Sequence, residues 1–110
     1  MQARYRLRQN ASFQYIYKNG QSAANRHMVI LFTKTKYTLK VGFSVSKKIG
    51  NSVVRNRTKR RLRECFRSLI PGLNKKYNYI VVAREAAATA EYAELLKSMR
   101  VTLTKVGMLI

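Results

Sequence analysis

The side chains of this sequence best suited to chemistry are the cations of one short segment. Residues 55 to 67 read R-N-R-T-K-R-R-L-R-E-C-F-R, in which seven of thirteen side chains are Arg or Lys and Glu64 is the single acid. Like charges four residues apart destabilise a helix, so this density indicates a partner that neutralises it. The guanidinium of Arg binds phosphate through paired hydrogen bonds and stacks on bases. A solvated face is the alternative, but such faces normally mix charges of both signs.

The charge of the whole chain favours the same kind of partner. The 110 residues include 23 Lys and Arg and only 4 acids, which gives a formal net charge of +19. Repulsion of this size works against the compact state and favours polyanions. The sequence therefore predicts a nucleic-acid-binding protein whose affinity falls steeply with salt, because each neutralised phosphate releases a counterion.

Catalysis by the protein itself has little support among the side chains. Metal-dependent phosphodiester hydrolysis needs several carboxylates around the ions, and the 4 acids are all glutamates, spread over residues 64 to 94. His27 is the only histidine and has no evident acid–base partner. Cys65 falls on an apolar helix stripe and is expected to be a core residue. We therefore expect no catalytic residue and no metal site in the chain.

The cysteine count and the hydrophobic runs indicate where the protein resides. Cys65 is the only cysteine, so no internal disulfide can form and a reducing compartment is expected. The longest apolar run, Met28 to Phe32, is too short to cross a bilayer, and no apolar segment follows the basic start as in a signal peptide. We predict a cytoplasmic protein that does not enter a membrane. Residues 1–110 are expected to form a single domain, since they contain no linker or repeat.

Hydrophobic spacing predicts the helix that must position the basic segment. Ser52 is expected to cap a helix that runs to about Ile70, where Pro71 and Gly72 stop it. The cations of this helix surround one inward stripe. The stripe is formed by Val54, Thr58, Leu62, Cys65, Phe66 and Leu69.

Other elements are expected before and after the basic helix. Asn10 and Gly20 bracket a first helix, as its N-cap and C-terminal residues. Thr89 is expected to open a last helix with Glu91 and Glu94 at its positive end. The segments with strand composition are residues 26–34, 37–47 and 77–83. A strand on each side of the basic helix implies a small sheet with helices packed on it, which is an α+β fold.

Aromatic side chains near the first helix suggest a second surface. Tyr5, Phe13 and Tyr17 would face the polar side of the strand that carries Ser44 and Ser46. Such an arrangement forms a cleft in which single-stranded bases stack. The alternative, equally supported by the sequence, is that Phe13 and Tyr17 are ordinary core aromatics.

The sequence around the basic helix also resembles a known family. Residues 47–63, K-K-I-G-N-S-V-V-R-N-R-T-K-R-R-L-R, resemble the signature of the protein component of bacterial ribonuclease P, centred on R-N-R at 55–57. The similarity continues in order over nearly the whole chain. It includes F-Q-Y-I-Y-K-N-G (13–20), S-A-A-N-R (22–26), V-G-F-S-V-S (41–46) and Y-I-V-V-A-R (79–84). The resemblance implies the element order αβββαβα and a fold like domain 2 of ribosomal protein S5.

The resemblance also implies a function. In this family the protein joins a catalytic RNA that removes the 5′ leader of precursor tRNA, and the RNA carries the chemistry with Mg²⁺ that it mainly holds itself. The implied partners are the catalytic RNA, at one protein per RNA, and the precursor tRNA. The isolated protein is expected to be inactive, and the protein is expected to aid the affinity for substrate and for Mg²⁺.

Two sets of residues take roles by their position in the family motifs. The basic helix of the family faces the catalytic RNA. The matching residues here are Lys48, Asn51, Arg55, Asn56, Arg57, Lys59, Arg60, Arg61 and Arg63. The central cleft of the family holds the single-stranded leader. The matching residues here are Phe13, Tyr17, Leu31 and Ser44, and Leu31 stands where relatives have an aromatic side chain.

Three other functions remain open from the sequence. A ribosomal or other structural RNA-binding protein would share the charge but would not change tRNA processing. A protein nuclease acting alone would cut without added RNA, although the scarcity of carboxylates argues against it. A protein that binds double-stranded DNA would be identified by competition between RNA and DNA at fixed salt.

Overall fold

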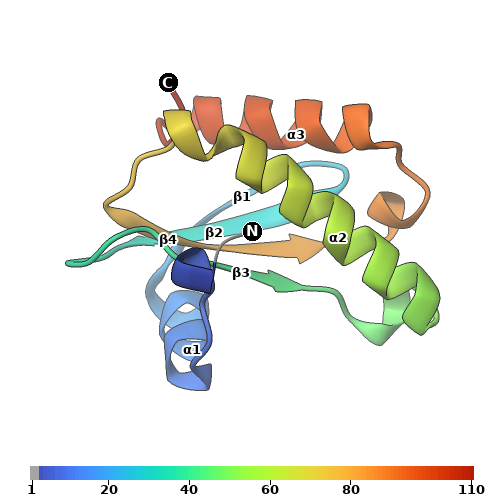
Figure 1. The fold of residues 1–110 in the computed structure, drawn as a ribbon, viewed down its shortest axis with the longest axis horizontal. Helices are drawn as coiled ribbons and strands as arrows, with labels where there is room; N and C mark the ends of the chain where they lie inside the picture. The colour runs from blue at the N-terminus through green and yellow to red at the C-terminus, as the bar shows by residue number, and fades with distance from the viewer. Residues whose placement is uncertain (1–2) are drawn as a thin grey trace.

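A mixed sheet lies at the centre of the computed structural model, which describes residues 3–110 (Figure 1). Its strands are β1 (Gln21–Ala24), β2 (Met28–Lys34), β3 (Val41–Ser44) and β4 (Tyr77–Ala83). The helices are α1 (Asn10–Asn19), α2 (Ser52–Leu69) and α3 (Tyr92–Lys105). Short 3₁₀ turns are η1 (Ala3–Tyr5), η2 (Lys47–Ile49), η3 (Ile70–Gly72) and η4 (Glu85–Ala88). This element order confirms the predicted αβββαβα fold.

The sheet has the order β1-β2-β4-β3. The pairs β1–β2 and β2–β4 are antiparallel, whereas β3 and β4 are parallel. Parallel neighbours need a crossover connection, and the basic helix α2 supplies it. As Figure 1 shows, α2 and α3 cover one face of the sheet, and α1 lies against the other face near one end.

The main core lies between the sheet and the pair α2–α3. The ring of Phe66 on α2 packs edge-on against Phe43 of β3 and Tyr79 of β4, with centroids 6.0 Å and 5.5 Å apart. The stripe predicted for α2 is buried except for Val54, which is half-buried because it lies in the exposed first turn. Thr58 joins this stripe by donating its hydroxyl to the Val54 carbonyl at 2.9 Å. The amphipathic pattern therefore predicted the inward face of α2 correctly.

Cys65 is a core residue, as expected, and His27 makes a structural contact. Cys65 is fully buried, and burial raises the pKa of its thiol to about 11, so it stays protonated at neutral pH. His27 is also buried, with Nδ1 2.7 Å from the Ser98 hydroxyl oxygen. That contact ties the turn between β1 and β2 to α3.

The predicted helix starts were wrong by one to three residues. The N-cap of α2 is Asn51, not Ser52, since the Asn51 Oδ1 accepts the Val54 N–H at 3.0 Å. Helix α3 begins at Tyr92, not Thr89, because Glu91 and Glu94 form a capping box there. Helix α1 already includes Asn10 and follows Gln9, whose side chain makes no cap hydrogen bond.

The segment 77–83 was predicted correctly as β4, but the other two predicted strands were too long. Strand composition did not locate β1, although the αβββαβα order implied by the resemblance includes it. The segment 37–47 contains only the short strand β3, and the segment 26–34 becomes β2 only at Met28. β1 has mostly exposed side chains, so it carries no hydrophobic alternation for a pattern to detect. Its place in the sheet comes from pairing with β2. No helix within residues 3–110 has the length and hydropathy of a membrane span.

Candidate RNA interface

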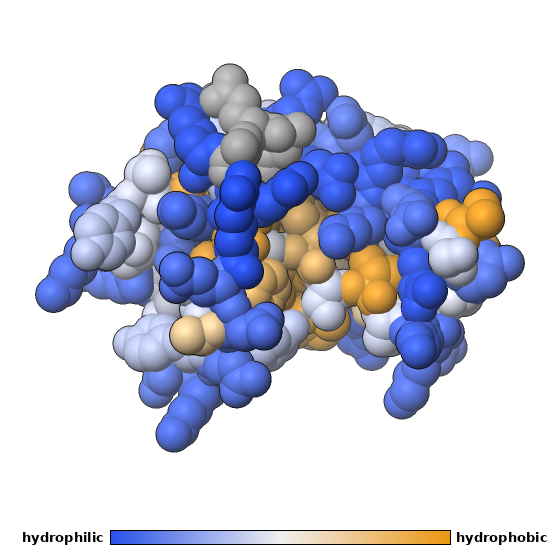
Figure 2. Space-filling view, turned by 60° about the horizontal axis from the view of Figure 1, so that its bottom comes forward, coloured by the Kyte–Doolittle hydropathy of each residue, from blue (hydrophilic) through white to orange (hydrophobic). Residues whose placement is uncertain are grey.

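The sheet face that carries α1 is only partly covered. Ile16 of α1 is 1% exposed and packs with Ile80 and Leu7 in a small second core. The strand register places Val29, Val82 and Ser44 in the next row of this face, and all three remain half-buried. Figure 2 shows the result, an apolar floor surrounded by hydrophilic side chains.

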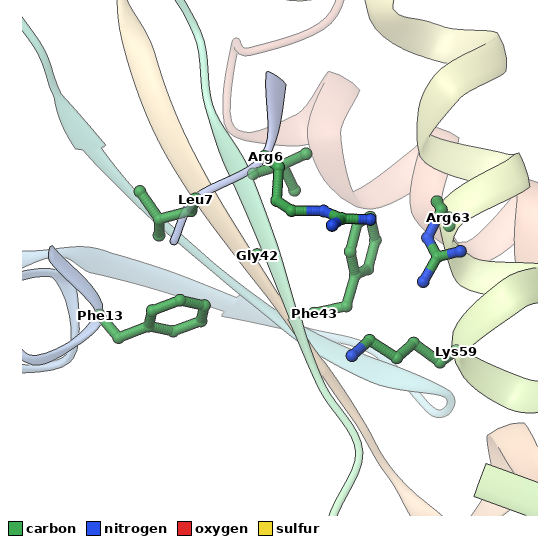
Figure 3. Close-up of a pocket in the computed structure, with 8 residues that line it drawn as sticks. Arg6, Leu7, Phe13, Gly42, Phe43, Lys59 and Arg63 are labelled. Atoms are coloured by element: carbon green, nitrogen blue, oxygen red, sulfur yellow. The ribbon is translucent and has the colours of Figure 1, made fainter. Parts of the chain in front are cut away.

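Phe13 forms one side of this cleft by packing directly on the backbone of β3. A Cβ atom added to Gly42 would lie 2.4 Å from the Phe13 ring, which is closer than atoms can approach. Glycine at this position therefore lets the tip of the ring approach the backbone of the strand closely. Figure 3 shows Phe13 reaching from α1 toward β3 at Gly42. The half-buried ring presents part of its surface to the cleft.

The other residues predicted for the cleft come from three elements. Leu31 is on β2 and pairs with Ile80 of β4, and Ser44 is the last residue of β3 and pairs with Val82 of β4. Both therefore lie on the open sheet face, as Phe13 does. Tyr17 follows Phe13 by one helical turn and is 48% exposed, which places it at the rim. Tyr5 does not belong to this set. It packs against the main core instead, with the Arg4 guanidinium 4.8 Å from its ring centroid.

A cationic wall stands beside the cleft at the edge of β3. A pocket of about 260 Å³ lies there between α1 and α2. In Figure 3, Arg6, Lys59 and Arg63 extend toward one another around this pocket. Lys59 and Arg63 lie one turn apart on the side of α2 that faces β3. The wall thus combines two residues predicted for the catalytic RNA with one that the sequence did not indicate.

Arg6 reaches this wall because the N-terminal segment runs along β3. The Leu7 N–H donates to the Val41 carbonyl at 2.9 Å, next to a bridge between Arg6 and Val41. That contact holds the segment at the sheet edge. Sequence reasoning overlooked Arg6, although the alternation of Arg4, Arg6 and Arg8 with other residues is a strand-like pattern that hinted at an ordered segment.

The first turn of α2 forms a second cationic surface. Gly50 has φ of 152°, a backbone conformation that glycine adopts readily, and it joins η2 to the helix. Lys48 on η2 and Asn56 on α2 are exposed, and Arg55 is half-buried. The N-terminus of a helix favours anions because its N–H groups point outward and its dipole is positive there. No acid lies in this turn.

Two arginines predicted for RNA binding are only partly available at the surface, because one bonds to the protein and the other is half-buried. The Arg61 Nη1 donates to the Ala90 carbonyl at 3.1 Å, which ties α2 to the segment before α3. The Nε of Arg57 is buried and has no hydrogen-bond partner among the described residues. Asn51 likewise uses its side-chain oxygen as the N-cap of α2. Arg60 and Lys59, in contrast, are exposed.

Almost none of this charge is neutralised by ion pairs among residues 3–110. In the part that the structure describes, the single ion pair joins Arg67 to Glu64 at 2.9 Å. That hydrogen bond lowers the pKa of the Glu64 carboxyl. No three His, Cys, Asp or Glu side chains within residues 3–110 lie close enough to hold a metal ion. The interface is therefore suited to binding polyanions through unpaired cations.

Comparisons with known proteins match nearly the full length of the chain. The family model described as Ribonuclease P matches residues 1–107. The ribonuclease P protein component of Oceanobacillus iheyensis is 40% identical over 111 residues, covering 99% of this chain and 92% of that protein. The ribonuclease P protein component of Geobacillus kaustophilus is 41% identical over 109 residues, covering 97% of this chain and 90% of that protein.

Solved structures agree with these sequence matches. The ribonuclease P protein of Staphylococcus aureus is 36% identical, with a TM-score of 0.87 over 96% of this chain and 98% of that one. The ribonuclease P protein of Thermotoga maritima is 28% identical, with a TM-score of 0.83 over 91% of this chain and 96% of that one.

Proposed function

The chain belongs to the ribonuclease P protein family, and on this premise we propose that its two cationic surfaces bind two different RNAs. It is a protein subunit of ribonuclease P, with a role in maturation of the 5′ end of tRNA. Its partner is the RNA of that enzyme.

The first turn of α2 and η2 bind the catalytic RNA. This surface presents Lys48, Arg55 and Asn56 near the positive end of a helix that has no acid in its first turn, and the exposed Arg60 continues it one turn further along α2. Phosphates of a folded RNA match such a surface, since each Arg–phosphate pair is charge-assisted and can be bidentate. Arg57 and Arg61 contribute with the part of each guanidinium that the protein leaves available. One protein binds one RNA.

The cleft binds the single-stranded 5′ leader of precursor tRNA. Its apolar floor accepts unpaired bases, and Phe13 and Tyr17 stack on them, while Leu31 and Ser44 shape the floor. Stacking on an aromatic side chain is worth about 1–3 kcal/mol per base. Lys59, Arg63 and Arg6 face this cleft, so we assign them to the leader backbone. The observation that carries this assignment is the meeting of an aromatic cleft and an unneutralised cationic wall at one strand.

The catalytic RNA carries the cleavage chemistry. Mg²⁺ prefers carboxylate oxygens and phosphates, and the side chains of this protein do not fit a magnesium cage, since its few carboxylates do not gather within residues 3–110. We propose that the RNA holds Mg²⁺. The protein lowers the repulsion between the two RNAs and so improves the affinity for substrate and for the ion. It acts in the cytoplasm.

Single-turnover cleavage of a precursor tRNA tests this function. A bacterial ribonuclease P RNA is assayed at low magnesium alone, with this protein, and with an unrelated protein of similar charge. We expect stimulation beyond that of the control protein and no cleavage when the RNA is omitted. Equal stimulation by both proteins would mean that this protein acts only by nonspecific screening of charge. Cleavage by the protein alone would refute the assignment of the chemistry to the RNA.

A further inference from the structure

Two loops meet at the end of the sheet opposite to the first turn of α2. They are the β2–β3 loop (residues 35–40) and the loop before β4 (residues 73–76), both at the left of Figure 1. The Thr35 N–H donates to the Lys76 carbonyl at 2.8 Å, and the Lys40 N–H donates to the Asn78 Oδ1 at 3.0 Å. These bonds bring together lysines from separate parts of the chain.

Four exposed lysines in or next to these loops, together with the exposed Tyr37, form a group that we call the lysine end. It consists of Lys34, Lys36, Tyr37, Lys40 and Lys76. None of its four lysines has an ion-pair partner within residues 3–110. Lys75 is excluded, because its Nζ donates to three carbonyls between residues 70 and 73 at 2.9 to 3.3 Å. The protein uses that one lysine itself and leaves the other four to solvent.

Tyr37 lies in the same loop as Lys36 and Lys40, and its ring is exposed. It is 76% exposed, more than Tyr15 (58%) or Tyr17 (48%). Its N–H donates to the Thr35 hydroxyl oxygen at 3.2 Å, which fixes the backbone of the turn. An exposed aromatic ring bordered by cations is the combination with which proteins bind single-stranded nucleic acids, since bases stack on the ring while phosphates pair with the cations.

We propose that the lysine end is a further binding surface for single-stranded RNA. Its lysines neutralise backbone phosphates, and Tyr37 stacks on an unpaired base. Lysine is a point charge without the planar fork of arginine, so this surface binds without preference for sequence. The surface goes beyond the proposed function, because it shares no residue with the cleft or with the first turn of α2. The variants that test it therefore change no residue assigned to those surfaces.

Fluorescence tests the stacking directly, because the chain contains no tryptophan. The Tyr37→Trp variant places a single reporter in the lysine end, and the Tyr92→Trp variant places one on α3, where Tyr92 is 37% exposed. Each variant is titrated with a short oligoadenylate, and fluorescence anisotropy of the labelled RNA reports binding. We expect the RNA to quench the emission of the Tyr37→Trp variant and not that of the Tyr92→Trp variant.

Salt dependence tests the lysines. The triple variant Lys34→Ala/Lys36→Ala/Lys76→Ala is compared with a matched triple variant on α3, Lys97→Ala/Arg100→Ala/Lys105→Ala, which removes the same charge from exposed positions. Each phosphate contact on a single strand contributes about 0.7 to the log–log salt slope, so the first variant should reduce the slope by about 2. The α3 variant should leave it unchanged. Tyr37→Ala should weaken binding at least about five-fold.

Three results would overturn the proposal. One is equal slopes for the two triple variants, which would mean that only net charge matters. Another is unquenched emission of the Tyr37→Trp variant while anisotropy shows the RNA bound. The third is a blue shift of that emission with vesicles containing phosphatidylglycerol and no response to RNA, which would assign the surface to a membrane. Circular dichroism confirms that each variant is folded.

Discussion

Helices α2 and α3 lie on the same face of the sheet, but their N-termini are capped in different ways. Helix α3 begins with a capping box of two acids, Glu91 and Glu94, which neutralise its positive end within the chain. Helix α2 begins with the neutral cap Asn51 and has no acid in its first turn. The positive end of the α2 dipole and the nearby cations are thus not neutralised by an acid in the first turn, so they can bind an external anion. The contrast supports the proposal that α2 binds a polyanionic partner, whereas the N-terminus of α3 is completed within the fold.

The largest expected effect comes from removing the cations at the start of α2. Arg55→Ala/Arg57→Ala should lower the affinity for ribonuclease P RNA about 100-fold, since hydrogen bonds to charged groups contribute about 1.5–3 kcal/mol each. Lys97→Ala/Arg100→Ala on α3 is the matched control and should change it little. Filter binding at fixed salt measures both. An equal loss of RNA affinity in the two variants would mean that α2 binds the RNA no more specifically than α3 does.

The seam between the two helices should show a pH dependence caused by Cys65. Its thiol lies against the start of α3, with Sγ 3.9 Å from the Tyr92 carbonyl oxygen, and burial raises its pKa from 9.0 to about 11. The native state thus holds this proton more tightly than the unfolded state. Stability from this group is complete below pH 9 and declines as the pH approaches 11, by about 2 kcal/mol.

Denaturant unfolding of the wild type and of Cys65→Ala from pH 7 to 11 measures this dependence. The wild type should lose more stability over that range than the variant does. Parallel pH profiles would mean that the thiol is not desolvated at the seam.

Phe13 should affect the choice of substrate, whereas binding of the catalytic RNA should still depend on α2 and not on α3. Phe13→Ala should reduce the preference for precursor over mature tRNA about five-fold or more, because a stacked base is lost. Gly42→Ala should have a similar effect, since its Cβ would displace the Phe13 ring. Competition binding to the assembled enzyme measures the preference. An unchanged preference in both variants would refute the assignment of the cleft to the leader.

Substitutions of the N-cap Asn51 should have the smallest effects, and they should separate the stability of the protein from its affinity for RNA. Asn51→Ala should cost about 1 kcal/mol through loss of the cap. Asn51→Asp keeps a capping oxygen and adds a charge that the helix dipole favours, so stability should be retained while binding to the catalytic RNA weakens. Thermal unfolding and filter binding report the two quantities. If the Asn51→Asp variant binds the RNA as well as the wild type does, the absence of an acid from the start of α2 does not contribute to RNA binding.

Much of the architecture followed from local patterns, and the errors have local causes. The stripe of α2 was predictable because apolar side chains at helical spacing must be buried together. Strand β1 was not, since its exposed side chains have no alternation and its order comes from pairing with β2. The starts of α2 and α3 were misplaced because several neighbouring polar residues could cap them. The observed hydrogen bonds selected Asn51 and Glu91.

The site residues divide in the same way. Sequence motifs indicated Phe13 and the cations of α2, but they could not show that Lys59 and Arg63 face the cleft or that Arg6 joins them. Nor could they distinguish Lys75, which binds backbone carbonyls, from the exposed Lys76. These distinctions depend on which side of a helix meets the sheet edge and on which loops touch.

The amino-acid sequence by itself determined the charge, the scarcity of acids and the inward stripes of the helices, because these depend only on composition and on the spacing of neighbours. Tertiary structure decided which cations share a surface. Residues distant in the chain, such as Arg6 and Arg63, meet across β3 only after the N-terminal segment pairs with that strand. Such meetings depend on long-range packing and strand pairing, which local sequence patterns do not encode.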